Sequence, residues 1–226
     1  MDVAVFPELF LSGYNLGQKL RELAEPADGV SIQKLCQIAK STGVAIITGY
    51  PERMGADIYN SALAISYDGK IIGHHRKVYL FGNREKTLFR PGSDFVAFEI
   101  AGHKCGLSIC YDIEFPEVTR EMKQQGIQIV FVPTANMEPY FEVPTTLARA
   151  RALENGLVIV YANLNGVEGD LSFVGLSGVI SPDGKDVARA GSDWTILITD
   201  LQPSFTRNET SPLSSQFQDL HAANWK

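Results

Sequence analysis

The sequence predicts a layered α/β sandwich that contains mixed β-sheets. Short apolar runs typical of strands alternate with segments of helical periodicity. Some runs, such as residues 44–50, are apolar at consecutive positions, which is typical of strands covered on both faces. Turn signals such as Asp68-Gly69 join other strands directly, so the chain combines hairpins with crossover helices. This combination favours mixed sheets packed in layers.

The first half of the chain should contain one helix and several strands. Residues 31–43 place apolar side chains on one helical face, with Ser31 as the expected N-cap and Gly43 as the stop. The strands of this half are expected at residues 2–6, 44–50, 60–67 and 71–77. The last two should form a hairpin at Asp68-Gly69.

The second half repeats the alternation of strands and helices. Strands at 95–100 and 104–110 should pair around Gly102, and a helix should run from about Pro116 to Gln125. The later elements are expected in the order strand 127–134, helix 145–156 closed by Gly156, strand 157–164, two strands meeting at residues 182–184, and a last regular element at 194–201.

Length and composition indicate one soluble domain. The chain has 226 residues, 45% of them hydrophobic, and we expect a single domain over residues 1–201. Residues 202–226 should form a C-terminal tail, extended as an arm at a subunit interface. A net charge of −6 without a basic stripe argues against nucleic acid. The apolar runs are too short for a membrane span, and Asp2 stands where a signal peptide would be basic, so we expect a cytoplasmic protein.

The three cysteines do not suggest a disulfide framework or a metal site. Their number is odd, and together with four histidines they never show ligand spacing. Cys36 lies on the apolar face of the expected helix and Cys105 lies within a strand, so both are interpreted as structural.

Cys110 is different because it ends the expected strand 104–110. This places it at the C-terminal edge of a sheet, where α/β proteins carry their chemistry. A helix beginning at Pro116 would direct its N-terminus toward the thiol and favour a thiolate. The acids Asp112 and Glu114 would instead raise the pKa of a thiol, and free cysteine is commonly a buried small hydrophobe. Spacing alone leaves both interpretations open.

Histidine, the usual base for a cysteine nucleophile, is not visibly available. His103 precedes Cys110 by seven residues, which is roughly 23 Å along an extended strand. His74 and His75 are neighbours on one strand and point to opposite faces. A carboxylate must therefore be considered as the base.

Glu8 and Lys77 are the two unusual charged residues, because each follows a strand and stands among apolar residues. An acid in such a place is expected to be paired or functional. Taken singly, however, Glu8 could be a capping acid and Lys77 a side chain that snorkels to solvent.

Glu8, Lys77 and Cys110 together resemble the nitrilase superfamily of carbon-nitrogen hydrolases. The resemblance lies in FPELFLSGY around Glu8, HRKVYLF around Lys77 and GLSICYDIEFPE around Cys110. NREKTLFRPG resembles the segment with the family's second glutamate, which corresponds to Glu85. Further similar segments, VPTANMEPY, ARARALENGLVIVYAN and GLSGVISPDGK, extend the resemblance to about Leu201.

The resemblance implies a four-layer αββα sandwich that forms a homodimer or a higher homo-oligomer, with no metal and no organic cofactor. It also implies that Cys110 attacks the substrate while Glu8 acts as the base. Lys77 and the backbone N–H of Tyr111 would stabilise the oxyanion, and Glu85 would orient the lysine or the substrate. Asp112 and Glu114 are then best interpreted as cap and surface residues, although Glu114 could face the site.

The expected substrate is a small carboxamide, because residues 133–178 most resemble short-chain and amino-acid amidases. Nitrile hydrolysis and N-carbamoyl amine hydrolysis remain alternatives, and so does an inactive binding or assembly module of the same fold. Substrate-contacting residues are expected in the loop NMEPYFE, namely Asn136, Met137 and Glu138. Glu138 or Glu142 could meet a substrate ammonium, with Tyr140 packing alongside, or the loop could simply be solvated.

The start of the chain raises a further expectation. Similar family members carry a strand and a helix before the FPE segment, whereas Glu8 here is the eighth residue. We expect either an N-terminally shortened form of a longer protein or a gap filled by a partner subunit or the C-terminal tail.

Overall fold

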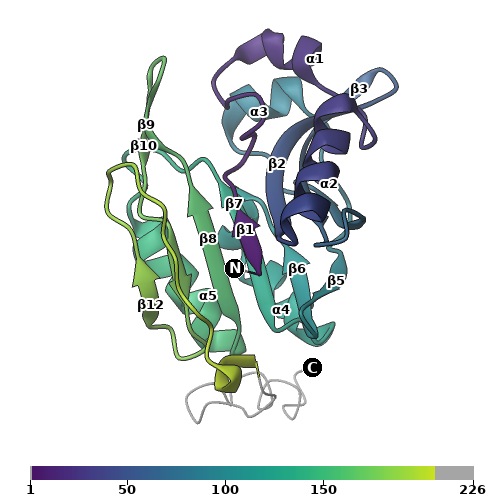
Figure 1. Cartoon of the computed structure of the whole chain (residues 1–226). Coiled ribbons are helices and arrows are strands. Elements are labelled where there is room, and N and C mark those ends of the chain that lie inside the picture. The colour runs from purple at the N-terminus through teal and green to yellow at the C-terminus, as the bar shows by residue number, and fades with distance from the viewer. Residues whose placement is uncertain (1, 207–226) are drawn as a thin grey trace, which may run out of the picture.

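Two mixed β-sheets form the centre of the structure, a computed structural model that describes residues 2–206 (Figure 1). The first sheet has the order β1-β2-β3-β4. Its strands are β1 (Val3–Val5), β2 (Ala45–Met54), β3 (Asp57–Ile65) and β4 (Ile71–Arg76). β1 runs parallel to β2, and the other neighbours are antiparallel. The turn between β3 and β4 contains Gly69 at φ +82°, which confirms the predicted hairpin.

The second sheet has six strands in the order β12-β11-β8-β7-β6-β5. Its strands are β5 (Ala97–Ile100), β6 (His103–Leu107), β7 (Ile129–Thr134), β8 (Val158–Asn163), β11 (Gly178–Ile180) and β12 (Asp186–Arg189). The central strands β6, β7 and β8 are parallel, and the outer pairs are antiparallel. Both sheets are therefore mixed, as the sequence predicts.

Helices cover the outer face of each sheet and complete four layers (Figure 1). α2 (Val30–Thr42) packs on the first sheet through Ile32 and Ala39. α4 (Pro116–Gln124) and α5 (Ala148–Asn155) pack on the second sheet. Apolar side chains of the two inner faces, such as Ile47 and Phe131, form the core between the sheets. This αββα arrangement confirms the predicted fold class and explains the strands that are apolar on both faces.

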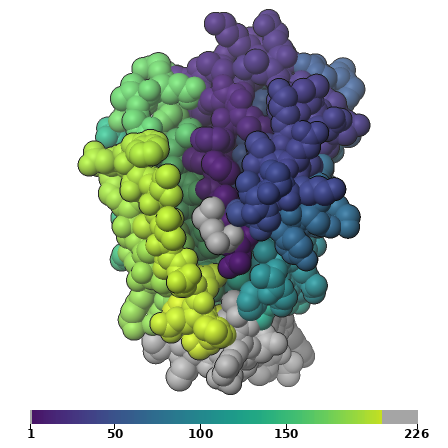
Figure 2. All heavy atoms as spheres, in the orientation of Figure 1, coloured from purple at the N-terminus to yellow at the C-terminus, as the bar shows by residue number. Residues whose placement is uncertain are grey.

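The space-filling view in the same orientation shows the blue N-terminal half on one side and the green and yellow C-terminal part on the other (Figure 2). Most of the remaining elements lie in the connections between the strands of the two sheets. The remaining elements are the helices α1 (Leu20–Leu23) and α3 (Gly82–Leu88), the 3-10 helices η1 (Gly17–Lys19), η2 (Cys110–Glu114) and η4 (Pro203–Thr206), the π-helix η3 (Val143–Leu147) and the strands β9 (Asn165–Glu168) and β10 (Leu171–Val174). β9 and β10 form a separate antiparallel hairpin.

The predicted helix N-cap at Ser31 is wrong, whereas the two predicted glycine stops are confirmed. α2 begins at Val30 with Gly29 as its N-cap, because the Ser31 hydroxyl and backbone N–H both donate to the Glu25 carboxylate. Gly43 at φ +67° and Gly156 at φ +60° end α2 and α5 in the left-handed conformation.

Residues 194–201 were expected to be the last regular element, and this prediction is wrong. The segment forms neither helix nor strand. It has the alternating apolar pattern of a strand, but Trp194, Ile196 and Ile198 are exposed and no described strand pairs with it. Pattern alone does not make a strand, because the backbone groups need a neighbouring strand to bond with.

The C-terminal tail predicted at 202–226 lies mostly outside the described residues, of which Pro203–Thr206 form η4. Within residues 2–206, none of the helices combines the length and the apolar character that crossing a membrane would require.

Candidate active site

Glu8 lies in the turn that follows β1, and its side chain is completely buried. The backbone of Glu8 passes directly over β2 at Gly49, where an added Cβ would stand 2.7 Å from the Glu8 Cα. Its Oε1 accepts hydrogen bonds from Lys77 Nζ at 2.7 Å and Asn60 Nδ2 at 2.6 Å. Its Oε2 is buried without a hydrogen-bonding partner among the described residues. One carboxylate oxygen is therefore held while the other is free to accept a proton.

Lys77 directly follows β4 and is completely buried. Its Nζ lies 2.7 Å from Glu8 Oε1 and 2.7 Å from Glu85 Oε1. Burial by itself lowers the pKa of Lys77, but the carboxylates of Glu8 and Glu85 outweigh burial and raise this pKa well above its usual value. Lys77 is accordingly a fixed ammonium group rather than a side chain that reaches solvent.

Glu85 lies on α3 and contacts the same lysine. Like Glu8, it is buried. Its Oε1 accepts hydrogen bonds from Lys77 and from the Tyr14 hydroxyl, both at 2.7 Å. Its Oε2 accepts the backbone N–H of Phe81 at 2.8 Å. With both oxygens occupied, Glu85 is arranged to hold the lysine.

Cys110 lies three residues beyond the end of β6, as the first residue of η2. The predicted strand 104–110 is therefore too long. Cys110 has φ +45°, a conformation that costs a non-glycine residue energy and is found at functional sites. The structure brings the buried thiol into the same cluster as Glu8, Lys77 and Glu85, whose charges all act on its pKa.

Asp112 fixes the turn that carries Cys110. Its carboxylate accepts N–H groups from Ile109 at 3.1 Å and from Tyr79 at 2.9 Å, and it lies 2.9 Å from the His75 ring. Asp112 caps the turn as expected, but it is completely buried, so the prediction of a surface residue is wrong. Asp112 links the turn that carries Cys110 to the segment that follows Lys77. Its role is therefore structural, and its presence does not speak against a nucleophilic Cys110.

Glu114, the other acid of this turn, is half-buried rather than a simple surface residue. Burial raises its pKa, and Lys77 partly offsets that effect. Its electrostatic interaction with Lys77 places it near the site.

The electrostatics of the site keep the Cys110 thiol protonated and make the Glu8 carboxylate more basic. Burial and the Glu8 carboxylate raise the pKa of the Cys110 thiol well above its usual value, and Lys77 only partly offsets this. Burial also raises the pKa of Glu8, against the opposing effect of Lys77. The site thus combines a thiol that holds its proton with a carboxylate made more basic than usual, which suits a general base.

The other cysteines lack these surroundings. Burial raises the pKa of Cys105 to about 12, and its thiol donates to the His103 carbonyl. Cys36 is half-buried on α2. Among the described residues, no group of three or more potential ligands is arranged to hold a metal ion.

Tyr111 follows the cysteine, and its N–H belongs to the first turn of η2, where backbone donors have no intrahelical acceptor. The expected helix at Pro116 is α4, but the turn adjacent to Cys110 is η2. The Tyr111 ring belongs to a row of aromatic rings. Its centroid lies 5.2 Å from that of Phe81 and 5.0 Å from that of Phe115. The row continues from Phe81 to Tyr140 at 5.6 Å.

The loop predicted to bind substrate divides into buried and exposed parts. Asn136 and Met137 are buried, and the Asn136 side chain donates to the Tyr140 carbonyl at 2.8 Å. Glu138 is exposed and tied through its backbone N–H to the carbonyl of Ser172. Tyr140 connects this loop to the aromatic row beside Cys110.

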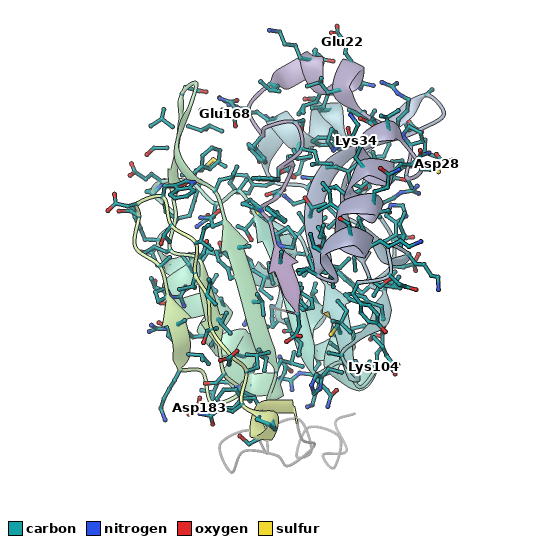
Figure 3. The ribbon with its side chains drawn as sticks, in the orientation of Figure 1. Glu22, Asp28, Lys34, Lys104, Glu168 and Asp183 are labelled. Atoms are coloured by element: carbon teal, nitrogen blue, oxygen red, sulfur yellow. The ribbon has the colours of Figure 1, made fainter. Side chains whose placement is uncertain are left out.

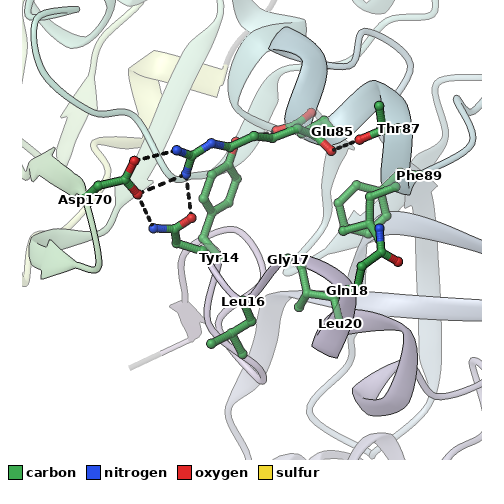
Figure 4. A pocket seen from close by; sticks show the side chains of 12 residues that line it. Tyr14, Leu16, Gly17, Gln18, Leu20, Glu85, Thr87, Phe89 and Asp170 are labelled. Atoms are coloured by element: carbon green, nitrogen blue, oxygen red, sulfur yellow. Dashed lines mark hydrogen bonds and ion pairs between the residues drawn. The ribbon is translucent and has the colours of Figure 1, made fainter.

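Two hollows flank the cluster, and neither is lined by Cys110, Glu8 or Lys77. One, of about 450 Å³, is walled by Tyr79, Tyr111 and Phe115 among others. The other, of about 550 Å³, lies behind the cluster and is lined by Tyr14 and Glu85 (Figure 4).

Tyr14 and Asn60 are site residues that the sequence did not single out. Tyr14 ends the quoted motif FPELFLSGY, and that position was the available signal. Asn60 lies inside β3, and the pairing of β3 with β2, where Gly49 lies against the Glu8 backbone, brings it to the Glu8 carboxylate.

The chain is similar to known carbon-nitrogen hydrolases. Residues 1–208 match the model of the carbon-nitrogen hydrolase family. A relative in Pseudomonas protegens described as the hydrolase in the pqqF 5'region is 43% identical, covering 88% of this chain and 71% of the relative. An (R)-stereoselective amidase of Pseudomonas sp. is 39% identical, covering 88% and 73%.

A solved structure of an amidase from Nesterenkonia sp. AN1 is similar throughout. It has a TM-score of 0.84 and 32% identity, and covers 100% of this chain and 84% of the amidase chain. In that structure the acetamide moiety of fluoroacetamide is covalently added at the active-site cysteine.

Proposed function

This chain belongs to the carbon-nitrogen hydrolase family and is an amidase, and on that premise we propose that it hydrolyses a small carboxamide to a carboxylic acid and ammonia through a thioester on Cys110. The observation that carries the proposal is the Glu8 carboxylate. One of its oxygens is fixed by Lys77 and Asn60, the other is buried without a partner among the described residues, and the carboxylate acts electrostatically on the Cys110 thiol.

In the first half of the reaction, the Cys110 sulfur attacks the amide carbonyl carbon while Glu8 takes the thiol proton. The new oxyanion accepts hydrogen bonds from Lys77 Nζ and the Tyr111 N–H. When the tetrahedral intermediate collapses, the C–N bond breaks and Glu8 gives its proton to the departing nitrogen. Ammonia leaves, and the acyl group remains on sulfur.

In the second half, Glu8 removes a proton from water as the water oxygen attacks the thioester carbonyl. Lys77 and Tyr111 stabilise the second oxyanion in the same way. The C–S bond then breaks, the acid is released, and the proton on Glu8 returns to Cys110. Glu8 therefore serves in both halves, which its raised pKa supports.

Glu85 contributes by keeping Lys77 charged and in place. Lys77 Nζ is shared between Glu8 and Glu85 at equal distances of 2.7 Å. Without Glu85, the ammonium would follow Glu8 alone and would be less constrained to face the oxyanion. We assign Glu85 as a positioning residue.

A panel of simple amides, nitriles and N-carbamoyl amines tests the proposal, with ammonia release as the measurement. We expect the amides to be the best substrates and Cys110→Ala to abolish release. Preference for nitriles or carbamoyl amines would overturn the choice of substrate class. No turnover of any compound by the folded protein would favour the inactive binding module instead.

Amino amides in the same panel test the predicted role of Glu138. If its exposed carboxylate meets a substrate ammonium, amides with an amino group should exceed isosteric neutral amides in kcat/KM. The ratio should fall in Glu138→Gln and remain in Glu117→Gln, a change on the exposed face of α4. If Glu138→Gln leaves the ratio of kcat/KM for amino amides to kcat/KM for neutral amides unchanged, Glu138 does not bind a substrate ammonium.

A further inference from the structure

We propose that Glu168, on the β9–β10 hairpin, is a positioning residue that holds Lys77 in place through Tyr14 and Glu85. The inference rests on the proposed amide hydrolysis for its kinetic test, but the contacts behind it do not. Glu168 lies far from Glu8, Lys77 and Cys110 in the sequence and, among the described residues, makes no hydrogen bond to any of them.

The Glu168 carboxylate accepts hydrogen bonds from the backbone of the loop after Glu8. Its Oε2 accepts the N–H groups of Tyr14 at 3.0 Å and Asn15 at 2.9 Å. Its Oε1 lies over Gly13, where an added Cβ would come within 2.4 Å of that oxygen. Gly13 has φ +92°, so the loop is shaped to receive this carboxylate. Figure 3 shows Glu168 at the hairpin, beside the purple N-terminal segment.

These hydrogen bonds fix the direction in which the Tyr14 hydroxyl points. Tyr14 is buried, and its ring meets the edge of Phe173 on β10 at 6.0 Å and 89°. The hairpin therefore holds Tyr14 both by its backbone and by its ring. From this position, the hydroxyl donates to Glu85 Oε1 at 2.7 Å, the same oxygen that accepts from Lys77.

The contacts that run from Glu168 through Tyr14 and Glu85 to Lys77 connect the parts of the site that come from the two sheets. The loop with Glu8 and Tyr14 follows β1 of the first sheet, and Lys77 follows β4 of the same sheet. Cys110 follows β6 of the second sheet, and the hairpin lies in the connection between β8 and β11 of that sheet. Glu168 thus fastens the base and the cation to the sheet that carries the thiol.

A neighbouring contact provides a matched control. Asp170, at the turn of the same hairpin, pairs with Arg84 and accepts from the Asn15 side chain (Figure 4). This pair is exposed, and exposed ion pairs contribute little. The hydrogen bonds of the Asp170 carboxylate within the described residues go to Asn15 and Arg84, and not to Tyr14. Removing its charge disturbs the hairpin without breaking the path to Glu85.

The experiment is a double-mutant cycle between Glu168→Ala and Tyr14→Phe, with Asp170→Asn as the control. Each single variant should lower kcat about tenfold or more with little change in KM, because a hydrogen bond to a charged group is lost. If Glu168 acts through Tyr14, the double variant should lose no more than the larger single loss. Glu168→Gln keeps an acceptor oxygen and should retain most of the activity, and Asp170→Asn should resemble the wild type.

The rate at which iodoacetamide alkylates Cys110, measured against pH, separates this inference from the proposed function. A displaced Lys77 stabilises the thiolate less, so Glu168→Ala and Tyr14→Phe should shift the alkylation profile to higher pH by the same amount, even if no amide is turned over. Losses that multiply in the double variant, or a Glu168→Ala profile equal to that of Asp170→Asn, would overturn the inference. If Glu168→Ala does not fold, Glu168→Asp, whose shorter side chain cannot reach both N–H groups, replaces it in the cycle.

Discussion

At the residue scale, the site depends on one carboxylate whose two oxygens have different surroundings. Glu8 Oε1 is fixed by two donors, and Oε2 is buried without a partner among the described residues. The sequence singled out Glu8, Lys77 and Cys110 by their local motifs and Glu85 by the family resemblance, and the structure brings these four side chains together. It did not identify Asn60 or Tyr14, whose partners are 52 and 71 residues away. Contacts of that kind leave no local pattern.

Glu8→Gln should lower kcat by about a thousandfold or more, because it removes a base that serves in both halves of the reaction. The exposed Glu117 on α4 provides the control, and Glu117→Gln should retain activity. In the wild type, kcat/KM should fall on the acid side as pH decreases through the raised pKa of Glu8, because the protonated carboxyl cannot accept the thiol proton. A midpoint below the usual glutamate value of 4.5 would contradict this assignment.

At the element scale, periodicity and turn signals predicted most strands and helices and two hairpin pairs, but not the pairing of strands that are distant in the sequence. Residues 194–201 alternate in polarity like a strand, yet no described strand pairs with them. The opposite error concerns β9 and β10, which were not predicted because their residues alternate weakly in polarity around Gly169 and Asp170. Elements that depend on tertiary contacts are the ones that a local pattern misses.

Glu52 on β2 illustrates an element-scale contribution to stability. Burial alone would raise its pKa, but hydrogen bonds from Arg76, His74 and Ser61 lower it to about 2. A lowered pKa stabilises the folded state above the unfolded value near 4.5, and the stability is lost as pH falls toward 2. Glu52→Gln should lower the free energy of unfolding by about 1–3 kcal/mol at neutral pH.

Urea unfolding at a series of pH values measures this effect. The difference between Glu52→Gln and wild type should shrink as pH falls from 4.5 to 2, and the exposed Glu99→Gln should show no such trend. A difference that stays constant over that range would mean that the ionised carboxylate is not what stabilises these strands.

At the scale of the whole molecule, the site exists because two sheets meet face to face. Glu8 and Lys77 come from connections of the first sheet, and Cys110 comes from the second. The sequence predicted both sheets and their mixed character, because buried strands and hairpin turns carry strong local signals. The way the sheets pack, which brings Asp112 into the interior, rests on long-range contacts, so Asp112 was wrongly predicted to be exposed.

We also predict that the chain forms a homodimer or a larger homo-oligomer. Trp194, Ile196 and Ile198 expose large apolar surfaces in one segment, which is typical of surfaces that associate. Light scattering across a range of protein concentrations should give a mass of at least two chains. Replacing Ile196 and Ile198 with Ser should reduce that mass, and a monomer at every concentration would contradict the prediction.

The formation of an acyl adduct on Cys110 tests the central claim most directly. The protein is mixed with a good amide substrate, quenched within the first turnover and analysed by intact-protein and peptide mass spectrometry. We expect the mass of one acyl group on Cys110, with Cys36 and Cys105 unmodified, and no adduct in a folded Cys110→Ala variant. An adduct on Cys36 or Cys105, or turnover that persists in Cys110→Ala, would contradict the account.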